Sequence, residues 1–152
     1  MTEPAPAFAD YVAICETKAR YCRCLDTKDW AGYADVFTDG VVLDTRASGG
    51  EMVEGREQVV AMVKSAIGKA ITVHQVHSPE IALTDPDTAE AIWAMQDHVV
   101  WDEAKAQAVG RKSLTGFGHY RETYRRCGDG AWRIARTELT RLHMSFESLT
   151  RG

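Results

Sequence analysis

Three ionisable side chains stand out because each lies within an apolar stretch of the chain. Asp26 is near the end of a segment with helical periodicity, His74 lies in a β-rich segment, and Asp97 alternates with apolar residues in a long strand-like segment. A carboxylate or an imidazole on an apolar face is costly unless it is paired. An Asp–His pair has a defined chemistry, because the carboxylate fixes the imidazole tautomer and lets the histidine accept a proton near neutral pH. These residues are therefore candidates for acid–base catalysis.

Tyr21 is a candidate partner in this chemistry. Its phenol could donate a hydrogen bond to a substrate carbonyl or to the enolate oxygen that develops from it. Tyr21 precedes Asp26 by five residues, which is about 140° around a helix of 3.6 residues per turn. Both side chains therefore reach one cavity only if the helix runs along the cavity mouth.

Each candidate also has a structural interpretation. Asp26 could equally cap a following helix, and a lone histidine such as His74 is more often a core or surface residue than a base. Asp97 and Arg141 could form an ion pair between strands, and a structural role fits that pair as well as a functional one. His119 could face either a pocket or the outside of the sheet.

The helices that would position these residues are predicted in the first half of the chain. Apolar residues at spacings of three and four indicate an amphipathic helix over residues 8–28. Thr27 or Asp29 can cap a short second helix. Its apolar residues are Trp30, Tyr33, Ala34 and Phe37. A turn at Asp39 and Gly40 follows, and a third helix covers residues 55–67.

The rest of the chain is predicted to be mostly sheet. The predicted strands cover residues 41–45, 71–83, 88–101, 114–126 and 131–144. Pro79 indicates a bulge in its strand, and Gly128-Asp129-Gly130 indicates a hairpin turn. Residues 46–54 are predicted as a glycine-bearing hairpin or loop, and the polar residues 103–113 as a loose loop.

The order of these elements predicts an α+β fold. Helices come first, and a run of antiparallel strands with tight turns follows. We expect a curved, mostly antiparallel sheet wrapped around the N-terminal helices. A sheet closed on its concave side by helices encloses an apolar pocket, which is the default site for a small-molecule ligand.

Length and charge exclude several classes of protein. The 152 residues predict a single domain over residues 1–152, with residues 1–8 as a flexible leader. The net charge of −4 and the scattered basic residues argue against a nucleic-acid partner. No apolar run approaches the length of a membrane span, and no signal-peptide pattern is present. We therefore expect a cytoplasmic protein with no membrane partner.

The cysteine and glycine patterns predict neither a metal nor a nucleotide site. Cys22 and Cys24 are separated by a single residue, and no second pair follows at ligand spacing, so reduced thiols are expected. Gly116 and Gly118 lie inside a strand-like segment and lack the third glycine and following helix of a dinucleotide-binding turn. The serine and threonine residues form no nucleophile elbow.

Several segments resemble the SnoaL-like proteins of the nuclear-transport-factor-2-like superfamily. Residues 19–26 with Asp29 and Trp30 resemble their opening helix, and residues 74–81 resemble their first long strand. The last hairpin of the family is matched by residues 118–120, 124–126 and 130–134. The resemblance covers about residues 13–146 and implies a cone-shaped α+β fold with an internal pocket.

Within this family the chain resembles the bacterial bile acid dehydratases most closely. Their active-site tyrosine, helix aspartate, catalytic histidine, strand aspartate and C-terminal arginine are matched by Tyr21, Asp26, His74, Asp97 and Arg141. The resemblance implies that His74, oriented by Asp26, abstracts a proton with loss of water or another leaving group. Tyr21 would hydrogen-bond a substrate oxygen, and Asp97 and Arg141 would line the pocket or hold a substrate group.

The resemblance also implies partners and alternatives. Scytalone dehydratase and hexachlorocyclohexane dehydrochlorinase, which are more distant relatives, run eliminations without a metal or organic cofactor. The expected substrate is a hydrophobic, cyclic, oxygenated molecule that is steroid- or polyketide-like. Relatives are commonly dimers or trimers, so a homo-oligomer is expected. Because the superfamily also contains isomerases, cyclases and non-catalytic binding domains, these functions are alternatives.

The chain departs from its relatives at a few positions. Scytalone dehydratase has a tyrosine where this chain has Leu25, and its second catalytic histidine aligns nearer Phe117 than His119. Bile acid dehydratases carry an aromatic residue in place of His119. His119 is therefore either an additional acid that contacts substrate or a polar neighbour. These departures affect the expected substrate more than they affect the assignment of His74 as the base.

Overall fold

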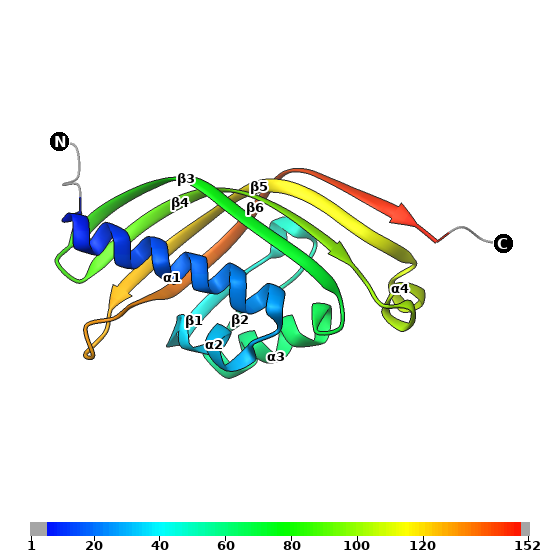
Figure 1. Ribbon diagram of the computed structural model, residues 1–152, viewed down its shortest axis with the longest axis horizontal. Helices are drawn as coiled ribbons and strands as arrows, with labels where there is room; N and C mark the ends of the chain where they lie inside the picture. Colours follow the sequence, from blue (N-terminus) through cyan, green and yellow to red (C-terminus); the bar gives the residue numbers. More distant parts are fainter. Residues whose placement is uncertain (1–5, 150–152) are drawn as a thin grey trace.

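The computed structural model describes residues 6–149 as a curved sheet with helices on its concave side (Figure 1). The helices are α1 (Phe8–Thr27), α2 (Trp30–Asp35), α3 (Arg56–Ile67) and α4 (Glu103–Val109), and a short 3-10 helix, η1, covers Arg46–Ser48. The strands are β1 (Phe37–Asp44), β2 (Met52–Glu54), β3 (Ile71–Asp85), β4 (Thr88–Val100), β5 (Arg111–Arg126) and β6 (Trp132–Ser148).

The sheet has the strand order β2-β1-β6-β5-β4-β3. Strands β3 to β6 pair antiparallel in sequence order, and β2 pairs antiparallel with β1. Only the β1–β6 pairing is parallel among the described strands. The α+β class and the mostly antiparallel sheet predicted from the sequence are thereby confirmed, and α1 runs beneath the arch of the sheet (Figure 1).

Helix α1 packs on the sheet through one buried face. Ile14, Tyr21 and Leu25 lie on this face at helical spacing. The helix ends at Thr27 because Lys28 adopts a left-handed backbone conformation with φ of 60°. It begins at residue 8, the last residue of the predicted leader, whose residues 1–5 lie outside the described part of the chain.

Helix α2 is capped by Asp29, one of the three candidate caps, the others being Asp26 and Thr27. Asp29 Oδ1 accepts a hydrogen bond from the backbone N–H of Gly32 at 2.9 Å. Asp26 therefore does not cap this helix. Phe37, predicted as the last apolar residue of the helix, instead begins β1 and is fully buried, because the chain passes directly from α2 into the sheet.

The predicted turn at Asp39 and Gly40 is wrong. Both residues lie within β1, where the pairing with β6 shifts register between Phe37 and Val42. An irregularity of this kind bends a strand locally, which accommodates a dipeptide that otherwise favours a turn. Residues 46–54 form a hairpin, which was one of the two predicted alternatives: they contain η1 and the short β2, which pairs antiparallel with β1.

The long strands follow the alternation in the sequence. Trp93, Asp97 and Val99 lie on one buried face of β4, as predicted. The bulge predicted near Pro79 is also confirmed, because the β3–β4 register shifts between His77 and Glu80.

The segment predicted as a loose loop at residues 103–113 is mostly ordered secondary structure. It contains α4, which buries Ala106 and ends at Gly110 with φ of 72°, followed by the first residues of β5. The sequence shows no amphipathic pattern for α4, because only one side chain of this helix is buried. No helix in the described part of the chain is long and apolar enough to cross a membrane.

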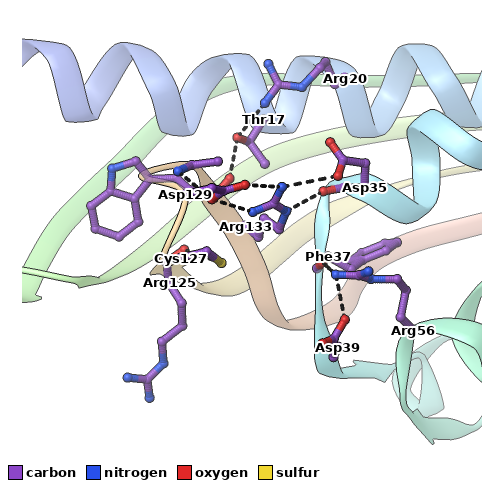
Figure 2. Close-up of polar contacts among 12 residues, drawn as sticks. Thr17, Arg20, Asp35, Phe37, Asp39, Arg56, Arg125, Cys127, Asp129 and Arg133 are labelled. Atoms are coloured by element: carbon purple, nitrogen blue, oxygen red, sulfur yellow. Dashed lines mark hydrogen bonds and ion pairs between the residues drawn. The ribbon is translucent and has the colours of Figure 1, made fainter.

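Arg133 ties the β5–β6 hairpin to the end of α2 (Figure 2). Its Nη1 and Nη2 each donate to Asp129 at 2.9 Å, and its Nε donates to the backbone oxygen of Asp35 at 2.9 Å. This cluster lies at the surface, since the side chain of Asp129 is 57% exposed.

Candidate active site

Asp26 and His74 meet where the C-terminal end of α1 lies against β3. His74 Nδ1 is 2.7 Å from Asp26 Oδ1, and the backbone N–H of His74 donates to Asp26 Oδ2 at 2.8 Å. Thr72 Oγ1 donates to Asp26 Oδ1 at 2.9 Å. Because β3 is an edge strand, its outward N–H groups are free to bond a side chain from α1. The carboxylate therefore fixes the orientation of the His74 ring.

Asp26 is held as a carboxylate at neutral pH. Burial raises the pKa of Asp26, but hydrogen bonds from His74 and Thr72 lower it by more, so its pKa lies below the ordinary value of 3.8. Lys28 Nζ donates to Thr72 Oγ1 at 2.8 Å, which directs the Thr72 hydroxyl hydrogen toward Asp26. These bonds offset the unfavourable position of an anion near the C-terminal end of a helix.

The charge on Asp26 determines the tautomer of His74. An ionised carboxylate only accepts hydrogen bonds, so we assign the hydrogen to His74 Nδ1. In the neutral ring, Nε2 is then an acceptor. The His74 side chain is only 8% exposed and lines a cavity. This arrangement is suited to general base chemistry.

Asp97 and Arg141 form a bidentate ion pair on the same side of the sheet. Arg141 Nη1 is 2.6 Å from Asp97 Oδ1, and Nη2 is 2.9 Å from Asp97 Oδ2. Arg141 Nε donates to Ser48 Oγ at 2.7 Å. Both charged side chains are buried, with 5% of Asp97 and 9% of Arg141 exposed. The pair crosses over β5, which lies between their strands.

Two features of β5 make this crossing possible. A Cβ atom on Gly116 would lie 2.5 Å from Arg141 Nη1 and 3.1 Å from Asp97 Oδ1, so only glycine leaves room for the guanidinium. The β5–β6 register also shifts between Thr123 and Tyr124, where one extra β6 residue lies between Ile134 and Arg136, and in this shifted register Arg141 lies opposite Gly118. Without that shift, the side chain of Arg141 would point to the outer face.

Tyr21 lines the same cavity, although it lies five residues before Asp26. Its ring packs against Tyr33 with centroids 5.2 Å apart, against Tyr120 at 5.7 Å, and against Phe37 at 5.9 Å. Burial raises the pKa of Tyr21 well above its ordinary value, so the phenol stays protonated and acts as a donor. The helix thus runs along the cavity, as the sequence required.

Behind these phenols lies a buried ion pair that the sequence analysis did not find. Lys18 Nζ is 2.6 Å from Glu122 Oε1, and both side chains are fully buried. Glu122 also accepts a hydrogen bond from Thr137 Oγ1 at 2.8 Å. Lys18 Nζ lies 3.8 Å from the ring centroid of Tyr21 and 3.6 Å from that of Tyr120, within cation–π range.

The cavity has a volume of about 260 Å³. Its polar wall includes Tyr21, His74, Asp97 and Arg141. Its apolar wall is formed by residues from α1, β1, α3 and the sheet: Leu25, Leu43, Met62, Val63, Ile67, Val99, Leu114 and Leu139. The structure therefore brings together five of the six predicted site residues. Four of them line the cavity, and the fifth, Asp26, is bonded to His74.

His119 is the predicted site residue that lies elsewhere. It pairs with Ala94 and Thr140 on the face of β5 opposite to Gly118 and Tyr120, and it is absent from the cavity wall. Strand alternation is the physical reason. His77 and His98, predicted to point away from the cavity, are exposed.

Four residues that support the site were not among the predicted site residues: Thr72, Lys28, Ser48 and Gly116. Thr72 could have been found, because it lies two residues before His74 and so shares its strand face. Ser48 and Lys28 carry no local signal. In residues 6–149, no group of three or more His, Cys, Asp or Glu side chains could hold a metal ion.

Known proteins resemble this chain in sequence or in overall structure. A family model described as the SnoaL-like domain matches residues 6–138. A candidate cyclase from Gibberella zeae is 25% identical over 141 residues, which cover 87% of this chain and 91% of that protein.

Two solved structures from Novosphingobium aromaticivorans share the fold. A candidate aromatic ring hydroxylase superposes with a TM-score of 0.82 and 22% identity, covering 93% of this chain and 96% of the other. A candidate scytalone dehydratase superposes with a TM-score of 0.77 and 17% identity, covering 95% of each chain. Because the family model matches most of the chain, the chain belongs to the SnoaL-like domain family.

Proposed function

We propose that this protein is a cofactor-independent lyase that eliminates water, or a similar leaving group, from a hydrophobic, cyclic, oxygenated molecule of steroid- or polyketide-like character. The observation that carries this proposal is the 2.7 Å contact between Asp26 Oδ1 and His74 Nδ1 in the wall of an apolar cavity. The relatives named for cyclase and dehydratase activity support an enzyme that converts a small molecule.

His74 is the proposed general base. Its Nε2 takes a proton from a carbon next to a substrate carbonyl, and the electron pair of the broken C–H bond forms an enolate. The carboxylate of Asp26 stabilises the imidazolium that results. A single acid–base group of this kind contributes roughly two to four powers of ten in rate.

Tyr21 is the proposed donor to the enolate oxygen. Its phenol stays protonated because burial raises its pKa, and a donor placed in advance stabilises charge as it develops. The enolate then collapses to form a C=C bond while the C–O bond at the next carbon breaks. The proton on His74 passes to the departing hydroxyl, so water leaves and the enzyme returns to its starting state.

The cavity volume limits how much of the substrate is enclosed. A dry apolar cavity of about 150 Å³ takes up benzene. A cavity of about 260 Å³ therefore encloses one or two fused rings, and a larger molecule would extend beyond its mouth.

The second candidate function is an isomerase or cyclase that uses the same base without loss of a leaving group. The similarity to a candidate cyclase favours it. Product mass separates the two functions, because dehydration removes one water and isomerisation leaves the mass unchanged. A non-catalytic binding domain is disfavoured by the pairing of His74 with Asp26 beside an open cavity.

The test uses cyclic β-hydroxyketones with one or two rings, incubated with the wild-type protein in deuterated water. We expect dehydration, seen by mass spectrometry, together with deuterium exchange at the acidic carbon. His74→Ala should lose about two to four powers of ten in both rates, whereas His77→Ala, on the exposed face of β3, should keep them. Turnover that persists in His74→Ala, or wild-type protein that turns over no compound, would contradict the proposal.

Asp26→Asn separates the catalytic role from a structural one. Because Asp29 and not Asp26 caps α2, we expect the rate to fall much more than the melting temperature. A lower melting temperature with an unchanged rate would mean that Asp26 only supports the fold.

A further inference from the structure

The charged groups in the cavity wall are all paired within the protein. Among the described lining residues, the ionisable groups with acid or base character are His74, Asp97 and Arg141, besides the tyrosine phenols. His74 Nδ1 is bonded to Asp26, and Asp97 is bonded to Arg141 through both oxygens. With the neutral His74 ring, the first pair carries the negative charge of Asp26, whereas the opposite charges of Asp97 and Arg141 cancel in the second pair.

Arg141 is the group that would otherwise hold an anionic ligand. Its Nη1 and Nη2 are each bonded to Asp97, and its Nε is bonded to Ser48 Oγ. The guanidinium therefore offers no free fork to a carboxylate or phosphate. An anion in this cavity would lose its hydration without gaining an uncompensated positive charge.

The remaining donors in the wall are neutral. Tyr21, Tyr33 and Tyr120 all line the cavity, and burial raises the pKa of each phenol. Tyr33 Oη is buried and has no hydrogen-bond partner among the described residues. Its ring is fixed by contacts with Tyr21 at 5.2 Å and with Phe37 at 5.0 Å between centroids. Protonated phenols suit carbonyl, ether or hydroxyl oxygens.

We infer that the cavity selects an uncharged ligand with hydrogen-bond-accepting oxygens, and that Asp97 determines this selectivity by neutralising Arg141. The inference rests on the proposed function only in placing the substrate in this cavity. It assigns Arg141 a role other than direct capture of an anionic substrate group. Gly116 contributes to this selectivity, because a side chain at this position would displace the Arg141 guanidinium.

The test measures binding of two probes of matched shape by isothermal titration calorimetry near neutral pH. Naphthalene-1-carboxamide is neutral and 1-naphthoate is an anion, and both carry the two rings that the cavity volume admits. We expect wild-type protein to bind the carboxamide at least about tenfold more tightly, because an unpaired charge is costly to bury. Binding of the carboxylate that equals or exceeds that of the carboxamide would overturn the inference, as would no binding of either probe.

Variants of the pair give the inference its sharpest check. Asp97→Asn keeps the shape and frees the charge of Arg141, so the preference should move toward 1-naphthoate by about tenfold or more. Arg141→Gln should move it the other way, which keeps the test open if one variant does not fold. Asp129→Asn is the matched control, because Asp129 pairs with Arg133 of strand β6 (Figure 2) and its side chain is 57% exposed.

Each outcome of these titrations decides the inference. An Asp97→Asn variant that folds but keeps the wild-type preference would overturn it, and so would an equal shift in Asp129→Asn. The readout is binding, so an absence of turnover would contradict the proposed lyase activity without touching this selectivity.

Discussion

Strand β6 carries the arginines of two arginine–aspartate pairs that have the same chemistry but different surroundings. Arg133 donates two hydrogen bonds of 2.9 Å to the carboxylate of Asp129. Arg141 donates two to the carboxylate of Asp97, at 2.6 and 2.9 Å. The first pair lies at the hairpin, where the Asp129 side chain is 57% exposed, whereas Asp97 is 5% exposed in the cavity wall. Solvent screens the first pair, while the second acts in a low-dielectric site. A bidentate arginine–aspartate pair therefore does not by itself indicate a functional site. Its position in the wall of a cavity is the distinguishing feature.

The largest expected difference between the pairs is the cost of removing the arginine. Arg141→Ala leaves the carboxylate of Asp97 buried without its partner, so the free energy of unfolding should fall by about 3–5 kcal/mol. Arg133→Ala leaves Asp129 in water, and the loss should be much smaller. Urea unfolding of both variants measures this. Equal losses would mean that burial does not distinguish the two pairs.

A smaller effect is expected from filling the space that the buried pair uses. Gly116→Ala places a Cβ atom 2.5 Å from Arg141 Nη1, and overpacking of this kind costs about 1–3 kcal/mol. Gly128→Ala is the matched control at the exposed hairpin, because a Cβ atom there meets nothing within 4 Å. Urea unfolding should show a loss for Gly116→Ala alone. A stable Gly116→Ala variant with unchanged probe selectivity would show that the guanidinium does not need this gap.

The pairing of Arg133 with Asp129 should be measurable through the pKa of Asp129. Hydrogen bonds, first from Arg133 and second from the backbone N–H of Ala131, lower the pKa of Asp129 to about 2, whereas burial acts in the opposite direction. In Arg133→Gln, the pKa of Asp129 should return toward 3.8, as measured by carbon NMR of the carboxyl group. An unchanged titration in the variant would assign the shift to the backbone N–H of Ala131 instead.

The smallest expected effect is on acid stability through Asp26, which has a histidine in place of an arginine as partner. The pKa of Asp26 is lowered below 3.8 in the folded protein. The unfolded chain therefore takes up a proton first as the pH falls. The stabilisation is complete above about pH 3.8 and is lost as the pH drops through the folded pKa. Asp26→Asn should show a shallower loss of melting temperature below pH 4 than wild type, and an identical loss would exclude this contribution.

The sequence was informative where local patterns decide the structure. The cap at Asp29, the bulge near Pro79, and the buried face of Trp93 and Asp97 all follow from residues close together in the chain. The predictions failed where a local preference was overridden, as at Asp39 and Gly40 inside β1. The similarity to bile acid dehydratases and the expected oligomer stay predictions.

The sequence by itself determined the residue types of the site, the helix that carries Tyr21 and Asp26, and the alternation that aims His74 and Asp97 inward. Only the tertiary structure decided which charges are paired. The register shift between Thr123 and Tyr124, which adds one residue to β6 after Ile134, turns Arg141 into the cavity, whereas His119 remains on the outer face. Side-chain direction in a strand depends on long-range pairing as well as on local sequence, and one extra residue in a strand reverses it.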